Sequence, residues 1–531
     1  MKKISNLLMM ALLAIGMGLT SCDEQLDNAV NPGVGEVTNI EFDLSKIDAK
    51  YLDSEKTKLQ LTEGDVVTLS FTILPEEAAD TKVELTAGDA TILSIDGLKV
   101  TVLKAGETKV TAKAGDKTAE IPVIVAADVS VDLSMLDNAG NTRDKQWTAN
   151  CYMVHTAGDY KLPLVYGNAI KDGAANTTAY NPGGSTNNFY CANFVNHAGT
   201  AINAPWITKS ADGTGADKGM GITVSSAELL WQDAEGLITK VGIIGDYLKL
   251  TVGKDATTQQ GNAVIAAKDA DGNIVWSWHI WVTTETFADA TLTTVTTGTG
   301  TLGTDYQVYK VTPVNLGWVP TDGNGKKGYA PYYQWGRKDA FIPSDGATFT
   351  EPFANHTVYD ISNTAVAGLT YEGSTTPTIA DNIKNPTTHY YNSTTQGPCN
   401  TTYYNMWDAQ QTNTGDIKTA TKKTVYDPCP AGFCVPTGNL YHYMNGVSFV
   451  WDDTNKGRNL TSVAPNVFFP ASGWRESNDG LFRLVGSHGY CWSASASSSN
   501  NGHGLGFKSD NLPWGQWKRA DGFSVRAVAE E

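Results

Sequence analysis

The chain has 531 residues and a formal net charge of −17, which disfavours nucleic acid and anionic lipid surfaces as partners. Its length exceeds what one hydrophobic core usually serves and predicts about three domains. Charged residues make up only 18 % of the sequence, while 52 glycines and abundant Thr, Asn and Ser favour strands and turns over long exposed helices. We therefore expect a mostly β protein with some α+β content.

The first 22 residues have the pattern of a bacterial export signal. Lys2 and Lys3 precede an apolar stretch at 7–19, which is long enough for a signal peptide and too short to cross a bilayer. The segment 19–22, Leu-Thr-Ser-Cys, resembles the lipobox of bacterial lipoproteins. The resemblance implies cleavage of the leader, residues 1–21, and lipidation of Cys22. An ordinary secretory signal is the alternative.

Residues 22–35 are polar and acidic and contain Pro and Gly, which is typical of a flexible tether. Acidic residues directly after the lipidated cysteine resemble a surface-export signal of some Gram-negative lipoproteins, although Asp there marks inner-membrane retention in others. No later apolar run reaches the roughly 18 residues of a transmembrane helix. The expected membrane contact is therefore the N-terminal lipid, in the outer membrane and facing the cell exterior.

Residues 36–127 alternate apolar and polar positions with period two, and turn signals such as Asp96-Gly97 separate the runs. Short strands at about ten-residue spacing predict a β-sandwich. The block resembles bacterial immunoglobulin-like repeats of group 2, with Leu85 where that family usually carries Trp. The resemblance implies an Ig-like stalk of a surface adhesin, and it rests on segments 74–78, 93–97 and 103–112.

Residues 128–290 are also rich in predicted strands, and we expect a second β-sandwich there. The strongest strand is 274–282, whose two faces are both apolar, which places it inside a sandwich or between domains. His279 on this strand is expected to be a buried structural histidine rather than a ligand. A stretch of small residues at 291–304 is expected to be a linker.

Residues 305–531 contain five aromatic-rich motifs, at 332–339, 424–437, 468–475, 486–495 and 522–528. Their order and spacing resemble the Fibrobacter succinogenes major paralogous (FISUMP) domain, which is thought to share the C-type-lectin-like fold. The resemblance implies a C-type-lectin-like head. Cys434 and Cys491 depart from the family pattern together, and Ala527 stands where many members carry cysteine.

Seven cysteines are present, and lipidation of Cys22 would leave six in an oxidising compartment. An even number in each block predicts three disulfides, although the last four cysteines allow three connectivities. The preferred pairs are Cys151 with Cys191, Cys399 with Cys429, and Cys434 with Cys491.

No catalytic or metal-binding motif is evident. The eight histidines form no ligand cluster, and no nucleophile elbow or phosphate-binding loop is present. The segment 451–453, Trp-Asp-Asp, resembles half of the calcium motif of C-type lectins, but 351–353 lacks the third ligand. Formylglycine-generating enzymes use a reactive cysteine pair on the same general fold, yet Cys434 and Cys491 are expected to form a structural disulfide instead. We expect no cofactor, no metal and no enzymatic activity.

Aromatic residues are the remaining candidates for binding. Trp514 and Trp517 fall in a Pro/Gly segment outside the family motifs, where loop tryptophans can stack on sugars or anchor a protein partner. Covering the C-terminal core is the alternative role. The full set of candidate ligand-binding residues is Trp514, Trp517, Trp474, Arg475 and His503.

These expectations combine into a lipid-anchored surface protein that presents a lectin-like head for adhesion or for binding a glycan or protein ligand. A glycan-processing enzyme and a purely structural envelope or fimbrial component are the alternatives.

Overall fold

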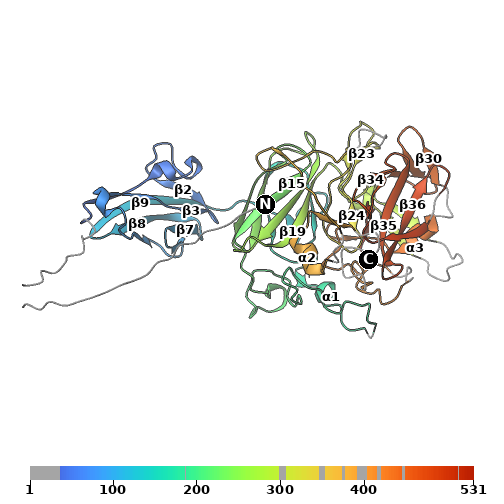
Figure 1. Cartoon of the computed structure of the whole chain (residues 1–531), viewed down its shortest axis with the longest axis horizontal. Coiled ribbons are helices and arrows are strands. Elements are labelled where there is room, and N and C mark those ends of the chain that lie inside the picture. The colour runs from blue at the N-terminus through green and yellow to red at the C-terminus, as the bar shows by residue number, and fades with distance from the viewer. Residues whose placement is uncertain are drawn as a thin grey trace, which may run out of the picture. The chain divides into compact units, whose positions relative to one another are not determined.

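The computed structural model describes residues 36–185, 187–297, 307–345, 353–373, 377–391, 403–414, 420–444, 449–511 and 514–531. The chain divides after Ala127 into two compact units (Figure 1), at the position where the first predicted block ends. The leader, Cys22 and the tether lie outside the described residues. No helix within the described ranges is long and apolar enough to span a bilayer.

The first unit is a β-sandwich. One sheet has the order β2 (Leu59–Thr62), β9 (Lys117–Ala126), β8 (Gly106–Ala114) and β5 (Glu84–Ala87), and the other has the order β3 (Val66–Thr68), β7 (Lys99–Val102) and β6 (Leu93–Asp96). Alternate residues of β9, Ile121, Val123 and Val125, are buried in the core, as the period-two pattern predicts. The predicted sandwich is confirmed.

The apolar run 67–73 is not one strand. Its first half forms β3, and its second half forms β4 (Phe71–Leu74), which pairs with β1 (Asn39–Phe42). Leu69 lies between the two strands and is fully buried. The chain therefore changes sheets within one alternating run, which keeps Val67 and Ile73 buried in two different clusters.

The second unit, residues 128–531, begins with a sandwich of a six-stranded and a four-stranded sheet. The six-stranded order is β11 (Cys151–Val154), β19 (Ile274–Val282), β18 (Gly261–Lys268), β15 (Ser226–Gln232), β25 (Val358–Tyr359) and β26 (Ala365–Val366). The four-stranded order is β10 (Val131–Asp132), β12 (Gly158–Pro163), β17 (Tyr247–Val252) and β16 (Ile238–Ile244). The mostly β fold with sandwich-like sheets is confirmed.

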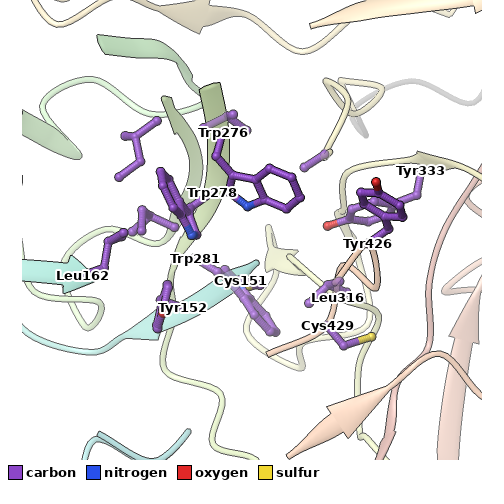
Figure 2. Packing of buried hydrophobic residues seen from close by; sticks show 14 of the residues in the cluster. Cys151, Tyr152, Leu162, Trp276, Trp278, Trp281, Leu316, Tyr333, Tyr426 and Cys429 are labelled. Carbon is purple, nitrogen blue, oxygen red and sulfur yellow. The ribbon is translucent and has the colours of Figure 1, made fainter. Parts of the chain in front are cut away.

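Strand β19 is buried on both faces, as predicted. It packs against residues of both the 128–290 block and the 305–531 block of this unit. Figure 2 shows its three tryptophans within one apolar cluster. Trp276 stacks on Tyr426 with ring centroids 6.1 Å apart. His279 Nε2 donates a hydrogen bond to Asn262 Oδ1 at 2.8 Å, and His279 Nδ1 lies 3.3 Å from the Tyr333 hydroxyl. Burial lowers the pKa of His279 to about 3, so the ring is a neutral structural group.

The sequence predicts separate domains at 128–290 and 305–531, with a linker at 291–304, and the structure differs. One hydrophobic cluster runs through both blocks, and the 358–366 hairpin completes the sheet that β15 belongs to. Part of the expected linker, Thr293–Thr296, forms strand β20. Composition marks this segment as small and polar, but it does not show that its backbone pairs with a later strand.

The C-terminal block consists of several small sheets. Their strands, in sheet order, are β20 (Thr293–Thr296), β21 (Val308–Val311), β39 (Val528–Ala529) and β29 (Phe433–Cys434); β24 (Tyr333–Gln334), β38 (Gly522–Phe523), β33 (Trp474–Arg475) and β34 (Phe482–Arg483); β35 (His488–Ala496), β36 (Asn501–Lys508) and β37 (Trp514–Lys518); and β30 (Phe449–Asp452), β31 (Gly457–Leu460) and β32 (Val467–Pro470).

Short elements complete the unit. They are the strand pairs β13 (Ile170–Lys171) with β14 (Ala174–Ala175), β22 (Val319–Pro320) with β23 (Gly328–Tyr329), and β27 (Thr370–Gly373) with β28 (Thr388–Tyr391), and the helices α1 (Thr177–Tyr180), α2 (Ile379–Lys384) and α3 (Gly438–Met444).

A buried ion pair organises the motif at 424–437. Lys423 Nζ lies 3.3 Å from the Asp427 carboxylate and also donates to the carbonyl oxygens of Cys429 and Phe433 at 2.6 Å. The second Asp427 oxygen accepts from the backbone N–H of Val435 at 2.9 Å. Each charge in this loop has partners, which offset part of the desolvation cost of burying it.

The predicted disulfides are not present among the described cysteines. Cys151, Cys191, Cys429, Cys434 and Cys491 are all free and buried, and Cys399 lies outside the described residues. Burial raises the pKa of the Cys151, Cys191 and Cys491 thiols, and the Cys191 thiol donates to the carbonyl of Asn193 instead. An even number of cysteines in each block and their order along the chain do not determine the distances between their Cα atoms or the directions of their Cβ atoms, and a disulfide depends on both.

Candidate functional site

Three half-buried aromatic side chains come together on the C-terminal sheets. Trp474 on β33, Tyr490 on β35 and Trp517 on β37 form what we call the aromatic patch. Tyr490 is the centre: its ring centroid lies 5.1 Å from Trp474 and 5.5 Å from Trp517, both in edge-to-face geometry. Two of the five candidate residues, Trp474 and Trp517, therefore lie in one surface because both contact Tyr490, which belongs to another motif.

Buried rings support the patch from below. Phe523 stacks on Tyr490 with centroids 4.8 Å apart and on Trp492 at 4.1 Å, and it meets Trp517 edge-on at 5.6 Å. Phe523 and Trp492 are almost wholly buried. The exposed rings thus rest on a packed base, which limits their rotation before any ligand arrives.

Glycines of the neighbouring strands make room for Trp517. A Cβ atom on Gly506 would lie 2.8 Å from Trp517 Cζ2, and one on Gly515 would lie 3.0 Å from Trp517 Cη2. Since real Cβ atoms do not approach so closely, the indole lies on bare backbone. A larger residue at Gly506 would push the ring away from the sheet.

Several core tryptophans donate their indole N–H to a protein acceptor, although the buried Trp278 Nε1 has none among the described residues. Trp335 Nε1 donates to the Ser493 carbonyl and Trp492 Nε1 to the Tyr333 carbonyl, each at 2.9 Å. The indole N–H groups of Trp474 and Trp517 have no acceptor among the described residues. Both patch rings are partly accessible, so their indole N–H groups can donate to a ligand.

Two acidic side chains lie beside the aromatic patch. Burial, helped by the nearby Glu476 carboxylate, raises the pKa of Asp521 to about 7. Burial, with a smaller contribution from the same two carboxylates, raises the pKa of Tyr490 to about 12. Asp521 accepts a hydrogen bond from the Ser477 backbone N–H at 2.9 Å. The site therefore combines flat aromatic faces with hydrogen-bond acceptors.

Two of the other candidate residues, Arg475 and His503, do not belong to this surface. Arg475 is fully buried and donates to the carbonyls of Gly480 and Ile342, each at 2.8 Å, so it is a framework residue. His503 pairs with Gln516 in the β36–β37 ladder, and burial lowers its pKa. The Trp514 side chain lies outside the described part of the chain. Its backbone begins β37, which replaces the expected loop with a strand.

The calcium half-motif has a different role. Asp452 accepts from the Asn455 side chain at 2.7 Å and pairs with Lys326 Nζ at 3.4 Å, so a lysine already occupies one side of this carboxylate. These hydrogen bonds, led by that from Asn455, lower the pKa of Asp452 to about 2. Within the described ranges no group of three or more His, Cys, Asp or Glu could hold a metal ion.

Sequence reasoning missed Tyr490 and Asp521. Both lie within or next to motifs that we noted, at 486–495 and 522–528, but neither stands out by residue type. The available signal was the alternation in 488–496, which places Tyr490 and Trp492 on one face. The contact to Trp474 depends on pairing between strands that are distant in the sequence.

No family model matches the chain, and no curated protein matches it. Among solved structures, domains 5–6 of the S-layer protein SbsC align with 45 % of this chain and 97 % of their own length, at 14 % identity and a TM-score of 0.12. An I-band fragment of titin aligns with 46 % of this chain and 64 % of its own length, at 10 % identity and a TM-score of 0.11. Similarity at this level carries no argument, and the family resemblances stay predictions.

Proposed function

We propose that this protein is a lipid-anchored cell-surface protein whose C-terminal half binds glycan through the aromatic patch. The single observation that carries the proposal is the patch: Trp474, Tyr490 and Trp517 form a supported, half-buried aromatic surface at which two indole N–H groups can meet a ligand. The anchor is supported by the lipobox-like segment that ends at Cys22. Mass spectrometry of the native N-terminus tests the anchor by itself.

A glycan fits this surface better than a generic apolar partner. The C–H faces of sugar rings pack against flat aromatic side chains, and sugar hydroxyls need both donors and acceptors. The indole N–H groups supply donors, and the partly exposed Glu476 carboxylate supplies an acceptor beside the rings.

The test is a glycan-array screen of the full chain, followed by calorimetric titration of the best oligosaccharide. Trp517→Ala and Trp474→Ala remove one face of the site each, and we expect each to weaken binding by about tenfold or more. Trp451→Ala is the matched control, because Trp451 is also half-buried but belongs to the separate cluster around Phe449.

Binding that is unchanged in both patch variants would place any glycan site elsewhere. Binding to no glycan at all would favour the structural envelope role. Thermal melting of each variant separates loss of the site from loss of the fold, since Trp517 also covers glycines of the sheet.

A glycan-processing enzyme is the second candidate, and one observation favours it. Asp521 has a pKa raised to about 7 and lies near the Glu476 carboxylate, which is the pattern of a general acid beside a second carboxylate. Against this, the Asp521 carboxyl is already engaged by the Ser477 N–H and is almost fully buried. Release of new reducing ends from bound oligosaccharides would decide for the enzyme.

A further inference from the structure

Three asparagines in this chain are followed directly by glycine, at 324–325, 445–446 and 501–502. Such a pair is prone to spontaneous loss of the side-chain amide, because glycine has no side chain to shield its own backbone nitrogen. The first pair lies in the turn between β22 and β23, the third lies in strand β36, and the second lies outside the described residues. The two described pairs have opposite surroundings.

The turn that contains Asn324 is exposed and held by few contacts. A Cβ atom on either neighbouring glycine, Gly323 or Gly325, would meet nothing within 4 Å. The Gly325 N–H donates to the Asp322 carbonyl at 3.3 Å, which is longer than an ordinary backbone hydrogen bond. The Gly325 carbonyl accepts from Trp318 Nε1 at 3.0 Å, but that carbonyl belongs to the next peptide plane. The Gly325 nitrogen can therefore turn towards the Asn324 side chain without a steric clash.

One hydrogen bond activates the Asn324 side chain for attack. The backbone N–H of Lys326 donates to Asn324 Oδ1 at 3.0 Å. This bond polarises the side-chain carbonyl and stabilises the negative charge that its oxygen gains when a nucleophile adds to the carbon. Because the bond reaches the second residue onward, it also keeps this carbonyl close to the nitrogen in between, which belongs to Gly325.

Asn501 has the same following residue in a rigid setting. Gly502 is paired on both sides, with strand β35 and with strand β37. The Asn501 carbonyl oxygen accepts from the Ser497 N–H at 2.9 Å. A Cβ atom on Gly502 would lie 2.5 Å from Cδ1 of Trp335, so the backbone here has no space in which to turn.

We propose that Asn324 is a site of spontaneous covalent modification, at which the folded chain loses ammonia and gains a carboxylate. The Gly325 nitrogen gives its proton to hydroxide, and its electron pair forms a bond to Asn324 Cγ. The Cγ–Nδ2 bond then breaks, and ammonia leaves with a proton taken from water, which completes a five-membered succinimide ring. Water opens the ring at either carbonyl and gives an aspartyl or an isoaspartyl residue.

The product changes both the charge and the backbone of the turn. The chain becomes one unit more negative than −17, and the new carboxylate directly precedes Gly325 and two lysines, Lys326 and Lys327. The isoaspartyl form also adds one carbon to the main chain, within a turn that the Thr321 N–H closes on the Lys327 carbonyl at 2.8 Å. The β22–β23 hairpin then has to accommodate this extra length.

The test is incubation of the full chain at mildly alkaline pH, followed by peptide mapping with mass spectrometry. Replacement of the amide NH2 by OH raises the mass of the peptide that carries it, and an isoaspartyl methyltransferase assay detects the isomerised product. We expect Asn324 to react about tenfold faster than Asn501 in the folded protein, or faster still.

Two controls assign this difference to the fold. Asn324→Gln removes the fast reaction, because glutamine would have to form a less favoured six-membered ring, and it leaves the rate at Asn501 unchanged. In concentrated guanidinium chloride the two asparagines of the wild type react at rates within about threefold of each other, since both are then followed by an unconstrained glycine.

The proposal is overturned if Asn324 stays intact in the folded chain, or if Asn501 reacts as fast as Asn324 there. It is also overturned if the same difference persists after unfolding, because the preference would then come from the neighbouring sequence. The reaction needs no ligand, so its outcome and the outcome of the glycan-binding test are separate results.

Discussion

Trp474 and Arg475 are neighbours on β33 and point to opposite faces, as successive strand residues do. Trp474 is half-buried in the aromatic patch, whereas Arg475 is fully buried. The Arg475 guanidinium also lies over the Phe482 ring at 4.0 Å. A buried guanidinium needs acceptors for its donors, and backbone carbonyls provide them here. One dipeptide thus contributes both to the surface and to the framework.

Asp521 gives a pH-dependent prediction. Its folded-state pKa of about 7 lies above the value of about 3.9 for an unfolded chain. Between about pH 4 and pH 7 the folded state binds the extra proton, so the free energy of unfolding falls as the pH rises. The penalty reaches about 4 kcal/mol at most. Asp521→Asn removes this titration, and its amide oxygen can still accept from Ser477 N–H.

We therefore expect the melting temperature of Asp521→Asn to rise relative to the wild type between pH 5 and pH 8, as measured by calorimetry. Asp510→Asn is the control, because Asp510 is exposed and its pKa is lowered, chiefly by the Lys508 side chain. An equal difference between Asp521→Asn and wild type at both pH values would show that the Asp521 carboxyl is ionised in the folded protein at pH 5.

At the scale of elements, strand β36 has a glycine at every second position, and these glycines let aromatic rings pack directly on its backbone. Gly502, Gly504 and Gly506 all face the same side, and large aromatic rings fill the space that their missing side chains leave. A Cβ on Gly502 would lie 2.5 Å from Cδ1 of Trp335, whose side chain is fully buried. Glycine weakens an isolated strand, but here it permits close packing of indole on backbone.

Gly502→Ala is predicted to destabilise the second unit by about 1–3 kcal/mol, because Trp335 cannot move away without disturbing the core. Gly242→Ala, in strand β16, is the matched control, since nothing lies within 4 Å of its Cβ position. We expect that control to be neutral or slightly stabilising in urea unfolding. Equal stability of the two variants would contradict the packing that we describe.

At the scale of the whole molecule, residues 128–531 act as one folding unit. The 358–366 hairpin extends the sheet through a pairing of Gln232 with Tyr359. Trp281 donates to the Trp318 carbonyl at 3.2 Å across the same junction. Separation of the two halves would expose these apolar side chains and leave a sheet edge unpaired.

We predict that a fragment of residues 128–531 unfolds in one cooperative transition, as measured by calorimetry, and that residues 305–531 alone do not give a dispersed NMR spectrum. Residues 36–127, which have their own core, are expected to fold alone. A well-dispersed spectrum from the 305–531 fragment would show that the shared core is not required.

The sequence by itself determined the strand-rich class, the first sandwich with its buried alternate positions, the double-sided burial of β19 and the structural role of His279. These follow from local periodicity and residue type, which act over a few neighbouring residues. Only the tertiary structure decided that the last two blocks share a core, that the described cysteines stay unpaired, and that Trp474 and Trp517 meet through Tyr490 while Arg475 turns inward. Those outcomes depend on which distant strands pair, because pairing sets the distances between side chains that the chain order leaves open.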